Sequence, residues 1–390
     1  MKHKHSIPFS KVDCSGNEMI YLKQVIKSGW LTSASKNVEF ENNFKKIIGS
    51  KYAFAVNSCT SALHLALEAI GIGPGDKVMV PSMTFTSSAE VIRYLGADPV
   101  FLDVEYDTLN VNPSIITNAL KKHSNIKAII IVHFGGQPAE MINKEKNGIL
   151  DICKNNNIKV IEDAAHTFPA CIGNKMIGNI GDLTCFSFYA NKTISTGEGG
   201  MVTTNKLKYA KRIRIMRSHG IDRNIWDRYT SKENKWEYDV LEAGFKYNLP
   251  DTSAAIGIAQ LERAEEMRLK RQICAEHYFR DLSGIRSIDL PHIRVPYEDH
   301  SWHLFVIKLN QHSRVKRNEF IDIMSRNGIS LSVHYKPLHK MTYYSKKYNL
   351  SKKDLPNTNK IWSRNVSLPI YSLLSIREIK YITKCITEIL

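Results

Sequence analysis

The chain of 390 residues is 43% hydrophobic and 24% charged, which is typical of a globular protein with one large domain and a smaller one. Its seven cysteines are scattered without a Cys-x-x-Cys pair, so neither a disulfide framework nor a metal site is expected. The net charge of +16 suggests an anionic partner, either a nucleic acid or a small polyanionic metabolite, but dispersed lysines carry most of it and mainly indicate a solvated surface.

The N-terminal third begins with two predicted helices within 15–49, separated by the loop GWLTSASKN. A strand over 52–56 then leads through the small residues 57–61 into a helix over 62–70. A strand, a hydroxyl-rich turn and a helix start together form a potential anion site, because free backbone N–H groups and the helix dipole point to one place. A plain Ser/Thr helix cap has the same pattern.

Strands and helices alternate from there to residue 166. Strands are expected over 77–81, 99–104, 127–133 and 158–162, and helices from Ser87, over 114–121 and over 144–155. This alternation predicts an α/β sheet with helices on both faces, in which ligands bind at the carboxyl ends of the strands. Several polar and aromatic residues stand at or just beyond these ends and could converge, namely Thr60, Phe85, His133, Asp163 and Lys192.

Lys192 lies between an apolar-aromatic strand, expected over 183–189, and a glycine-rich turn that precedes a strand over 201–204. A lysine at the end of a buried strand loses hydration, which lowers its pKa and makes the neutral amine available as a nucleophile. Such an amine can form a Schiff base with an aldehyde. A solvated lysine on a turn is the commoner situation, so this residue alone does not decide the function.

The rest of the chain predicts a second domain. A basic helix over 206–218 leads into an irregular stretch, 219–250, and a long helix over 251–280 would form the hinge. Beyond it we expect strands over 303–309 and 330–335 and helices over 316–327 and 375–390. The predicted division is therefore a large domain at 1–250 and a small one at 251–390.

Taken together, these segments resemble the sugar aminotransferases of the DegT/DnrJ/StrS family, within the fold-type-I pyridoxal-phosphate enzymes. The resemblance covers nearly the whole chain. Its motifs are GWLTSASKNVEFE (29–41), NSCTSALHLAL (57–67), VPSMTFTSSAEVI (80–92), VHFGGQPAEM (132–141), EDAAH (162–166), FSFYANKTISTGEGGMV (186–202), GFKYNLPDTSAAIGIAQL (244–261), VHYKPLH (333–339) and LPIYSLLS (368–375). It implies an aspartate-aminotransferase-like α/β fold, with a mostly parallel central sheet, helices on both faces and a smaller C-terminal α+β domain.

The resemblance also implies a cofactor, pyridoxal 5'-phosphate, which acts as an electron sink. Lys192 would hold it as a Schiff base and then serve as the catalytic base. Asp163 would pair with the pyridine nitrogen and keep it protonated. His166 would approach the phenolic oxygen or the ring, and Phe85 would stack on the ring face.

Other motif residues would hold the cofactor's phosphate. By the same resemblance these are Thr60, Ser61 and Ser187, together with Asn248 reaching over from a second subunit, which implies a homodimer with shared active sites. Cys59 stands where glycine is common. Cysteine is small enough to fit there, provided that its backbone is not left-handed.

The function implied by the resemblance is a cytoplasmic transamination. The amino group would pass from glutamate to a nucleotide-diphosphate-linked keto sugar. The motifs look most like those of the family branch that acts on UDP-linked 4-keto sugars. The product would be used in surface glycan biosynthesis. Substrate contacts are expected from Trp30, Leu31, Thr32 and His334 and from parts of 219–229. Some relatives that act as dehydratases carry histidine at the lysine position, so Lys192 favours transamination.

Two alternatives stay open. Within the fold, the reaction could be a dehydration, or the acceptor could be a 3-keto sugar or a dTDP- or GDP-linked one. Outside this chemistry, the protein could be a non-enzymatic, basic nucleic-acid-binding or regulatory protein on the same scaffold. The basic clusters 206–214 and 346–353 lack the regularly interleaved aromatic residues of a single-strand binding face. Membrane insertion is not expected, because no apolar run approaches roughly 20 residues, and the first residues lack the apolar core of a signal peptide.

Overall fold

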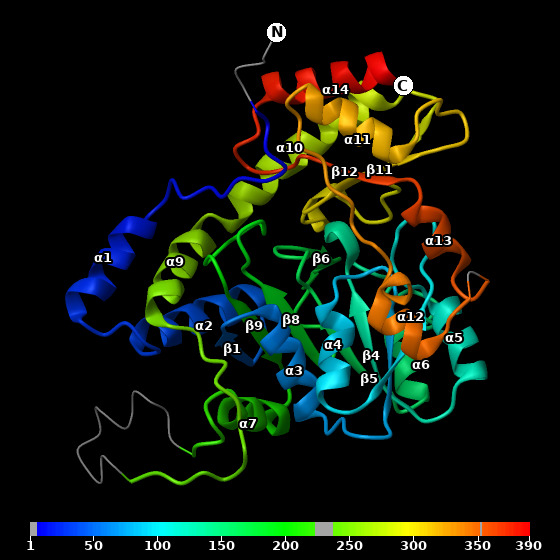
Figure 1. Cartoon of the computed structure of the whole chain (residues 1–390). Coiled ribbons are helices and arrows are strands. Elements are labelled where there is room, and N and C mark those ends of the chain that lie inside the picture. The colour runs from blue at the N-terminus through cyan, green and yellow to red at the C-terminus, as the bar shows by residue number, and fades with distance from the viewer. Residues whose placement is uncertain (1–5, 223–236, 352) are drawn as a thin grey trace.

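The computed structural model describes residues 6–222, 237–351 and 353–390. Its larger part is a seven-stranded sheet between two layers of helices, and its smaller part lies above one end of that sheet (Figure 1). This confirms the predicted α/β fold with a smaller C-terminal α+β part.

The large sheet has the strand order β1-β9-β8-β5-β4-β2-β3, and β9 runs antiparallel to both of its neighbours while the others are parallel. Its central strands are almost fully buried, as expected for apolar runs covered on both faces. The strands are β1 (Tyr52–Val56), β2 (Lys77–Pro81), β3 (Asp98–Leu102), β4 (Ile126–Val132), β5 (Lys159–Asp163), β8 (Leu183–Ser187) and β9 (Gly200–Thr204). A small hairpin, β6 (Cys171–Ile172) with β7 (Lys175–Met176), lies between β5 and β8 in the chain.

Each face of the sheet has its own hydrophobic core. One face packs against α3 (Cys59–Ala69), α4 (Ser87–Tyr94) and α7 (Leu207–Met216). The other packs against α5 (Pro113–Lys122) and α6 (Ile149–Asn155), and towards β1 against α2 (Ser35–Ile48) and α9 (Asp251–Glu262). The helix α1 (Glu18–Ser28) lies against α9 and projects to one side (Figure 1). Within the described residues, no helix is long and apolar enough to cross a membrane.

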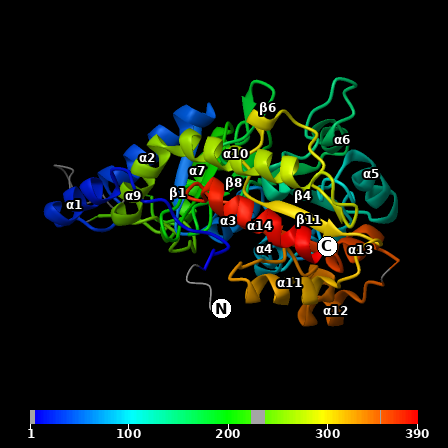
Figure 2. The same cartoon turned by 90° about the horizontal axis from the view of Figure 1, so that it is seen from above.

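The smaller part is a three-stranded antiparallel sheet, β10 (Ile288–Asp289), β11 (Phe305–Leu309) and β12 (Asn365–Leu368). The helices α10 (Ala264–Leu282), α11 (Arg317–Arg326) and α14 (Ile376–Ile389) lie together at this end of the molecule (Figure 2). The helix α14 begins with a capping box between Ser375 and Glu378, in which each side chain bonds the backbone N–H of the other.

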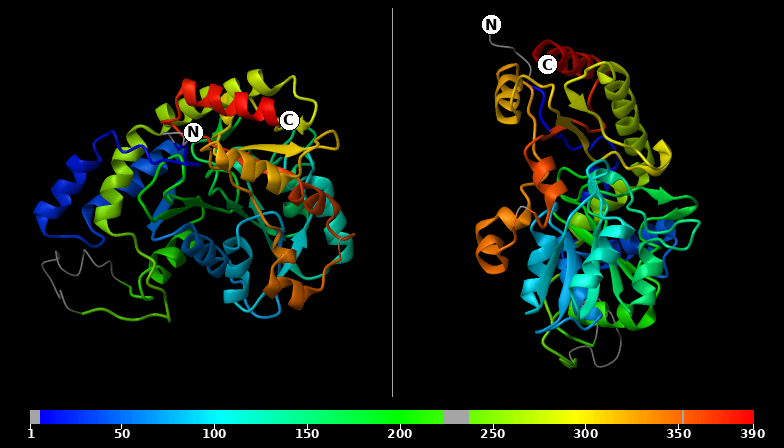
Figure 3. Two further views of the ribbon diagram at one scale, coloured as in Figure 1. Left: turned by 45° about the horizontal axis from the view of Figure 1, so that its top comes forward. Right: turned by 90° about the vertical axis from the view of Figure 1, so that its right-hand side faces the viewer.

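Two further helices connect the smaller part to the large sheet. They are α12 (Thr342–Tyr348) and α13 (Pro356–Trp362), and α12 descends beside the large part in the side view (Figure 3). The Tyr344 side chain joins the core of the large sheet, and the Tyr348 hydroxyl donates a 2.8 Å hydrogen bond to Asp98. The two parts are therefore joined by packing as well as by the chain.

Three predicted elements were wrong. The expected helix over 251–280 is two helices, because Arg263 leaves helical geometry (φ −114°, ψ 8°) and separates α9 from α10. The expected strand over 330–335 forms only one bridge, between Ser332 and Ser367 of β12, and at Tyr335 the backbone N–H already donates to the Met83 sulfur of the larger part. The helix expected from 144 begins at 149, after Gly148, where a Cβ would lie 2.8 Å from the Met141 carbonyl oxygen.

Candidate active site

A cavity of about 460 Å³ opens at the carboxyl ends of the parallel strands. Loops after β1, β2, β5 and β8 form its floor, and two residues from the smaller part form one wall. Its lining residues are Ser58, Cys59, Thr60, Thr84, Phe85, Ser87, Val132, Asp163, Ala165, His166, Ser187, Tyr189, Asn191, Lys192, Glu198, Gly199, His334 and Tyr335. Four of the five residues that we expected to converge at the strand ends therefore line this cavity. The fifth, His133, is fully buried and bonds Glu162 at 2.9 Å instead of lining the cavity.

Lys192 follows β8 in a short turn, and its backbone N–H donates to the Tyr189 carbonyl at 3.0 Å. Burial lowers the pKa of its amine from 10.5 to about 8, with a further lowering from the positive charge of Arg271, while Cys59 and Asp163 oppose the shift. Within the described part of the chain no carboxylate forms an ion pair with this amine. A lysine in this state is partly neutral near pH 8 and can act as a nucleophile or base.

Asp163 is the last residue of β5, the strand paired with β8. Its Oδ2 accepts a 2.7 Å hydrogen bond from the Ser88 hydroxyl, and its Oδ1 accepts from the Ala165 backbone N–H at 3.2 Å. Burial raises the pKa of this carboxyl, and the two hydrogen bonds and the Lys192 charge counteract that rise. The site therefore holds a buried carboxylate acceptor beside a lysine of lowered pKa.

The turn between β1 and α3 forms the end of the cavity that suits an anion. Thr60 lines it at the start of α3, and Ser187 lines it at the end of β8. The turn is tight: a Cβ on Gly200 would lie 2.6 Å from the Ser58 carbonyl carbon. Cys59 lies inside α3, so its backbone is right-handed, as its fit required.

Ser61, by contrast, does not line the cavity. Its hydroxyl bonds Asn57 at 2.5 Å and Ser58 at 2.9 Å, and its backbone N–H bonds the Ser58 hydroxyl oxygen at 3.1 Å. In this structure Ser61 therefore stabilises the turn between β1 and α3 through hydrogen bonds. Its direct contact with a phosphate stays a prediction.

His166 has both ring nitrogens in hydrogen bonds. The Gly135 backbone N–H donates to Nδ1 at 3.2 Å, so in the neutral ring the proton lies on Nε2, 2.9 Å from the Tyr335 hydroxyl. Burial holds the pKa of His166 well below its usual value, so the ring is neutral. Because Nε2–H donates to Tyr335, the hydroxyl hydrogen of Tyr335 is directed elsewhere, and Tyr335 lines the cavity.

Tyr335 is a site residue that the sequence analysis missed. It stands next to His334 in the motif VHYKPLH, so the signal was the motif itself. His334 also lines the cavity; its Nδ1 lies 2.8 Å from the Ser367 hydroxyl, and burial lowers its pKa to about 4.

The remaining predicted residues lie outside this cavity. The Asn248 amide donates a 2.6 Å hydrogen bond to the Ser33 hydroxyl. Trp30, Leu31 and Thr32 lie between α1 and α2, with Leu31 and Thr32 exposed. The predicted contacts within 219–229 fall largely on 223–229, outside the described residues. One chain thus brings together Thr60, Phe85, Asp163, His166, Ser187, Lys192 and His334, but not the other five.

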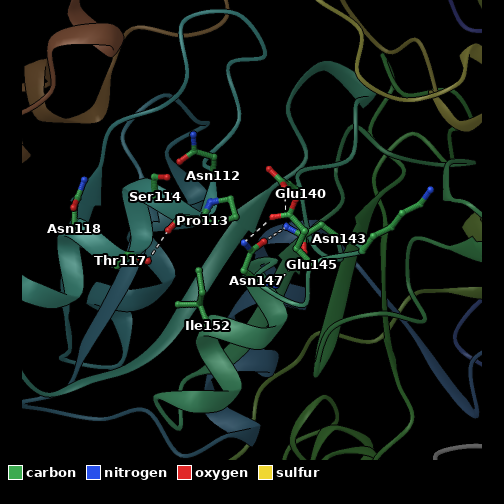
Figure 4. A pocket seen from close by; sticks show the side chains of 11 residues that line it. Asn112, Pro113, Ser114, Thr117, Asn118, Glu140, Asn143, Glu145, Asn147 and Ile152 are labelled. Atoms are coloured by element: carbon green, nitrogen blue, oxygen red, sulfur yellow. Dashed lines mark hydrogen bonds between the residues drawn. The ribbon is translucent and has the colours of Figure 1, made fainter.

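A wider hollow of about 680 Å³ lies elsewhere, between α5 and the segment before α6. Its polar residues mostly satisfy one another: Asn143 bonds Glu140 at 3.0 Å and also bonds Asn147 (Figure 4). It contains no buried carboxylate, since Glu140 and Glu145 are both exposed. The chemistry of the molecule is concentrated at the strand ends instead.

Comparison with known proteins agrees with this geometry. Residues 13–387 match the DegT/DnrJ/EryC1/StrS aminotransferase family. The chain belongs to this family. Aminotransferases of the family use pyridoxal 5'-phosphate, so the predicted family and cofactor are confirmed.

Individual family members match along almost their full length. The uncharacterized protein MJ1066 of Methanocaldococcus jannaschii is 40% identical over 378 residues, 96% of each chain. The spore coat polysaccharide biosynthesis protein SpsC of Bacillus subtilis is 38% identical over 392 residues, 100% of this chain and 98% of SpsC. Among solved structures, the PLP form of "Putative sugar aminotransferase Spr1654" from Streptococcus pneumoniae has a TM-score of 0.87 and 27% identity, covering 99% of this chain and 100% of that one.

The residues in the cavity fit the family's cofactor. An aldehyde needs a neutral amine, which Lys192 supplies; a protonated ring nitrogen needs a buried acceptor, which Asp163 supplies. A phosphate needs N–H and hydroxyl donors in a close turn, and such a turn lies at the start of α3 with Thr60 and Ser187 facing the cavity. The chain thus has a matching group for each part of the cofactor.

Proposed function

We propose that this family member transfers an amino group from glutamate to the keto carbon of a nucleotide-diphosphate-linked sugar, with a UDP-linked 4-keto sugar as the first candidate, for surface glycan biosynthesis in the cytoplasm. The observation that carries the proposal is the pairing, in one cavity, of an amine with a pKa of about 8 and a buried carboxylate. The same cavity is also lined by two histidines and a tyrosine that can face a sugar, namely His166, His334 and Tyr335.

The cofactor supplies an electron sink that makes the α-proton of an amino acid removable. Lys192 would hold the cofactor and, as a free amine, would serve as the base that accepts and returns the substrate proton. Its lowered pKa leaves part of the amine neutral for this work. Asp163 would hold a proton at the ring nitrogen of the cofactor. Thr60, Ser187 and the first turn of α3 would bind its phosphate.

The proposed acceptor rests on relatives and on charge. SpsC is named for polysaccharide biosynthesis and Spr1654 as a sugar aminotransferase. A nucleotide-linked sugar carries a pyrophosphate, and the net charge of +16 attracts such an anion. Trp30, Leu31, Thr32 and His334 are the proposed sugar and nucleotide contacts, the first three from the loop after α1.

The proposed assembly is a homodimer with shared active sites. Its support is a set of large apolar side chains left exposed on α1 and at the cavity mouth: Met19 is 76% exposed, Ile20 57% and Phe85 57%. Side chains of this kind gather where a second copy would cover them. In that arrangement Asn248, which does not line its own cavity, would reach the partner's phosphate.

Mixing two inactive variants tests the shared site. Lys192→Ala and Asn248→Ala homodimers should each be inactive, whereas hybrids formed by mixing them would contain one intact site. Random exchange should then restore about a quarter of the wild-type activity. A tagged pull-down first shows that hybrid dimers have formed in the mixture. If such a mixture recovers no activity, the proposal of shared active sites is refuted.

The reaction is tested by an absorbance scan of the purified protein before and after adding glutamate. An absorbance band at the edge of the visible range that shifts when glutamate is added would show the first half of a transamination. UDP- and dTDP-linked 3-keto and 4-keto sugars are then tried as acceptors, and the position of the new amine is located on the product. A protein that stays colourless with added pyridoxal phosphate would instead favour the non-enzymatic scaffold.

A further inference from the structure

Asp163 receives its shortest hydrogen bond from a residue that has no assigned role. The Ser88 hydroxyl, in the first turn of α4, lies 2.7 Å from Asp163 Oδ2, and Ser88 is 0% exposed. The Thr84 hydroxyl lies 2.9 Å from the Ser88 hydroxyl, and Thr84 is 2% exposed and lines the cavity. These three side chains form a buried chain that leads from the cavity wall to the carboxylate.

The direction of the two hydroxyl hydrogens follows from the carboxylate. An ionised carboxylate only accepts hydrogen bonds, so the Ser88 hydrogen points to Asp163. The Ser88 oxygen can then only accept from Thr84, whose own hydrogen points to Ser88. The hydroxyl hydrogens of Thr84 and Ser88 therefore both point along the chain towards the Asp163 carboxylate. Hydrogen bonds in such a chain polarise one another in a buried setting.

The ordered chain matters because, among the groups that offset the burial of Asp163, the Ser88 hydroxyl acts most strongly. The other donors are the Ala165 N–H at 3.2 Å and the Cys59 thiol at 4.0 Å, both on Oδ1. The charged and titratable groups that act on it are Lys192 and His133, with the Lys192 charge weakening as pH approaches about 8. Oδ2 has Ser88 as its donor.

We propose that Ser88, oriented by Thr84, is a positioning residue that keeps Asp163 ionised and aimed at the ring nitrogen of the cofactor. This rests on the function proposed above, since it needs the cofactor to sit against Asp163. Ser88 touches neither the cofactor nor the substrate in this role; it acts through the carboxylate. The hydroxyl is required, and threonine would keep a hydroxyl on the same carbon.

The test measures the affinity of the apoenzyme for pyridoxal phosphate, by absorbance, between pH 5 and 8. Ser88→Ala should weaken binding by about tenfold to a hundredfold, the range for a lost hydrogen bond to a charged group. Without the donor the pKa of Asp163 rises, so the weakening should be greatest at the acid end and the acid limb of the profile should move to higher pH. Thr84→Val should show the same change, smaller, and Ser88→Thr should restore the wild-type profile.

A matched control removes a buried hydroxyl elsewhere. Thr203 is 0% exposed and its hydroxyl donates to the Gly178 carbonyl at 2.8 Å. Thr203→Val should lower thermal stability without changing the affinity profile, so a general loss of packing is distinguishable from a change at Asp163.

The outcomes separate this inference from the proposed function. If the wild-type protein binds pyridoxal phosphate and Ser88→Ala has the same affinity profile as the wild type, the proposed role of Ser88 alone is overturned. If Ser88→Ala does not fold, Thr84→Val decides: a profile equal to that of the wild type would overturn the role. A wild-type protein that binds no pyridoxal phosphate would overturn the proposed function and this inference with it.

Discussion

Lys192 should react with an aldehyde at neutral pH far more readily than an ordinary lysine. Only the neutral amine is a nucleophile. A pKa of 10.5 leaves about 0.03% of an amine neutral at pH 7, whereas a pKa of about 8 leaves about 9%, which is roughly 300 times more. Burial in the cavity floor causes this change, and the Asp163 charge limits it.

The assay is the rate at which apoenzyme gains the visible-edge band after mixing with pyridoxal phosphate, measured from pH 6 to 10. Because deprotonation activates the amine, the rate should rise with pH and level off with a midpoint near 8. Asp163→Asn removes a negative charge that raises the Lys192 pKa, so its midpoint should fall. Lys192→Ala should give no band, and free N-acetyl-lysine should keep accelerating beyond pH 10.

A midpoint near 10.5 in the wild-type protein would refute this reasoning. It would mean that water or a counter-charge reaches the amine and that burial does not set its protonation. A midpoint near 8 that does not move in Asp163→Asn would retain the burial argument but remove the coupling between the two groups.

Three further changes test the surroundings of the site. Gly200→Ala should weaken phosphate binding, because its Cβ would lie 2.6 Å from the Ser58 carbonyl carbon; unchanged cofactor affinity would contradict this. Tyr335→Phe should leave the His166 N–H without its acceptor and cost about 1–3 kcal/mol in urea unfolding; an unfolding curve equal to the wild type would contradict a stabilising hydrogen bond between these two side chains. Phe44→Ala, a fully buried core position, should cost about 3–5 kcal/mol while the pH midpoint of Lys192 stays near 8.

The parts of the site that the sequence predicted are those fixed by strand ends. Asp163 ends β5, and Lys192 follows β8 by a short turn, with β5 and β8 paired so that Asp163 lies opposite Cys185. Apolar runs locate such strands, and parallel pairing brings their ends to one edge. Thr60 and Phe85 reached the cavity for the same reason.

The parts that the sequence did not predict depend on contacts between distant segments. Ser88 lies in a helix whose pattern reports only which face is buried, and its partner Asp163 is 75 residues away. Tyr335 meets His166 across 169 residues. The segment 330–335 was expected to form a strand, but in the structure it brings His334 and Tyr335 to the cavity.

Because these residues come from different parts of the molecule, two properties can be measured independently: the attachment of the cofactor and the turnover of the sugar acceptor. Asp163 ends a strand of the large sheet and Lys192 lies in the turn after another, so attachment of the cofactor depends on that sheet. Tyr335 comes from the smaller part and lines the cavity itself. It also accepts a hydrogen bond from His166, whose neutral ring carries no charge to influence Lys192. Tyr335→Phe should therefore leave the pH midpoint of cofactor attachment near 8 while lowering kcat with the sugar acceptor. A shift of the midpoint in this variant would show that the smaller part also controls the protonation of Lys192.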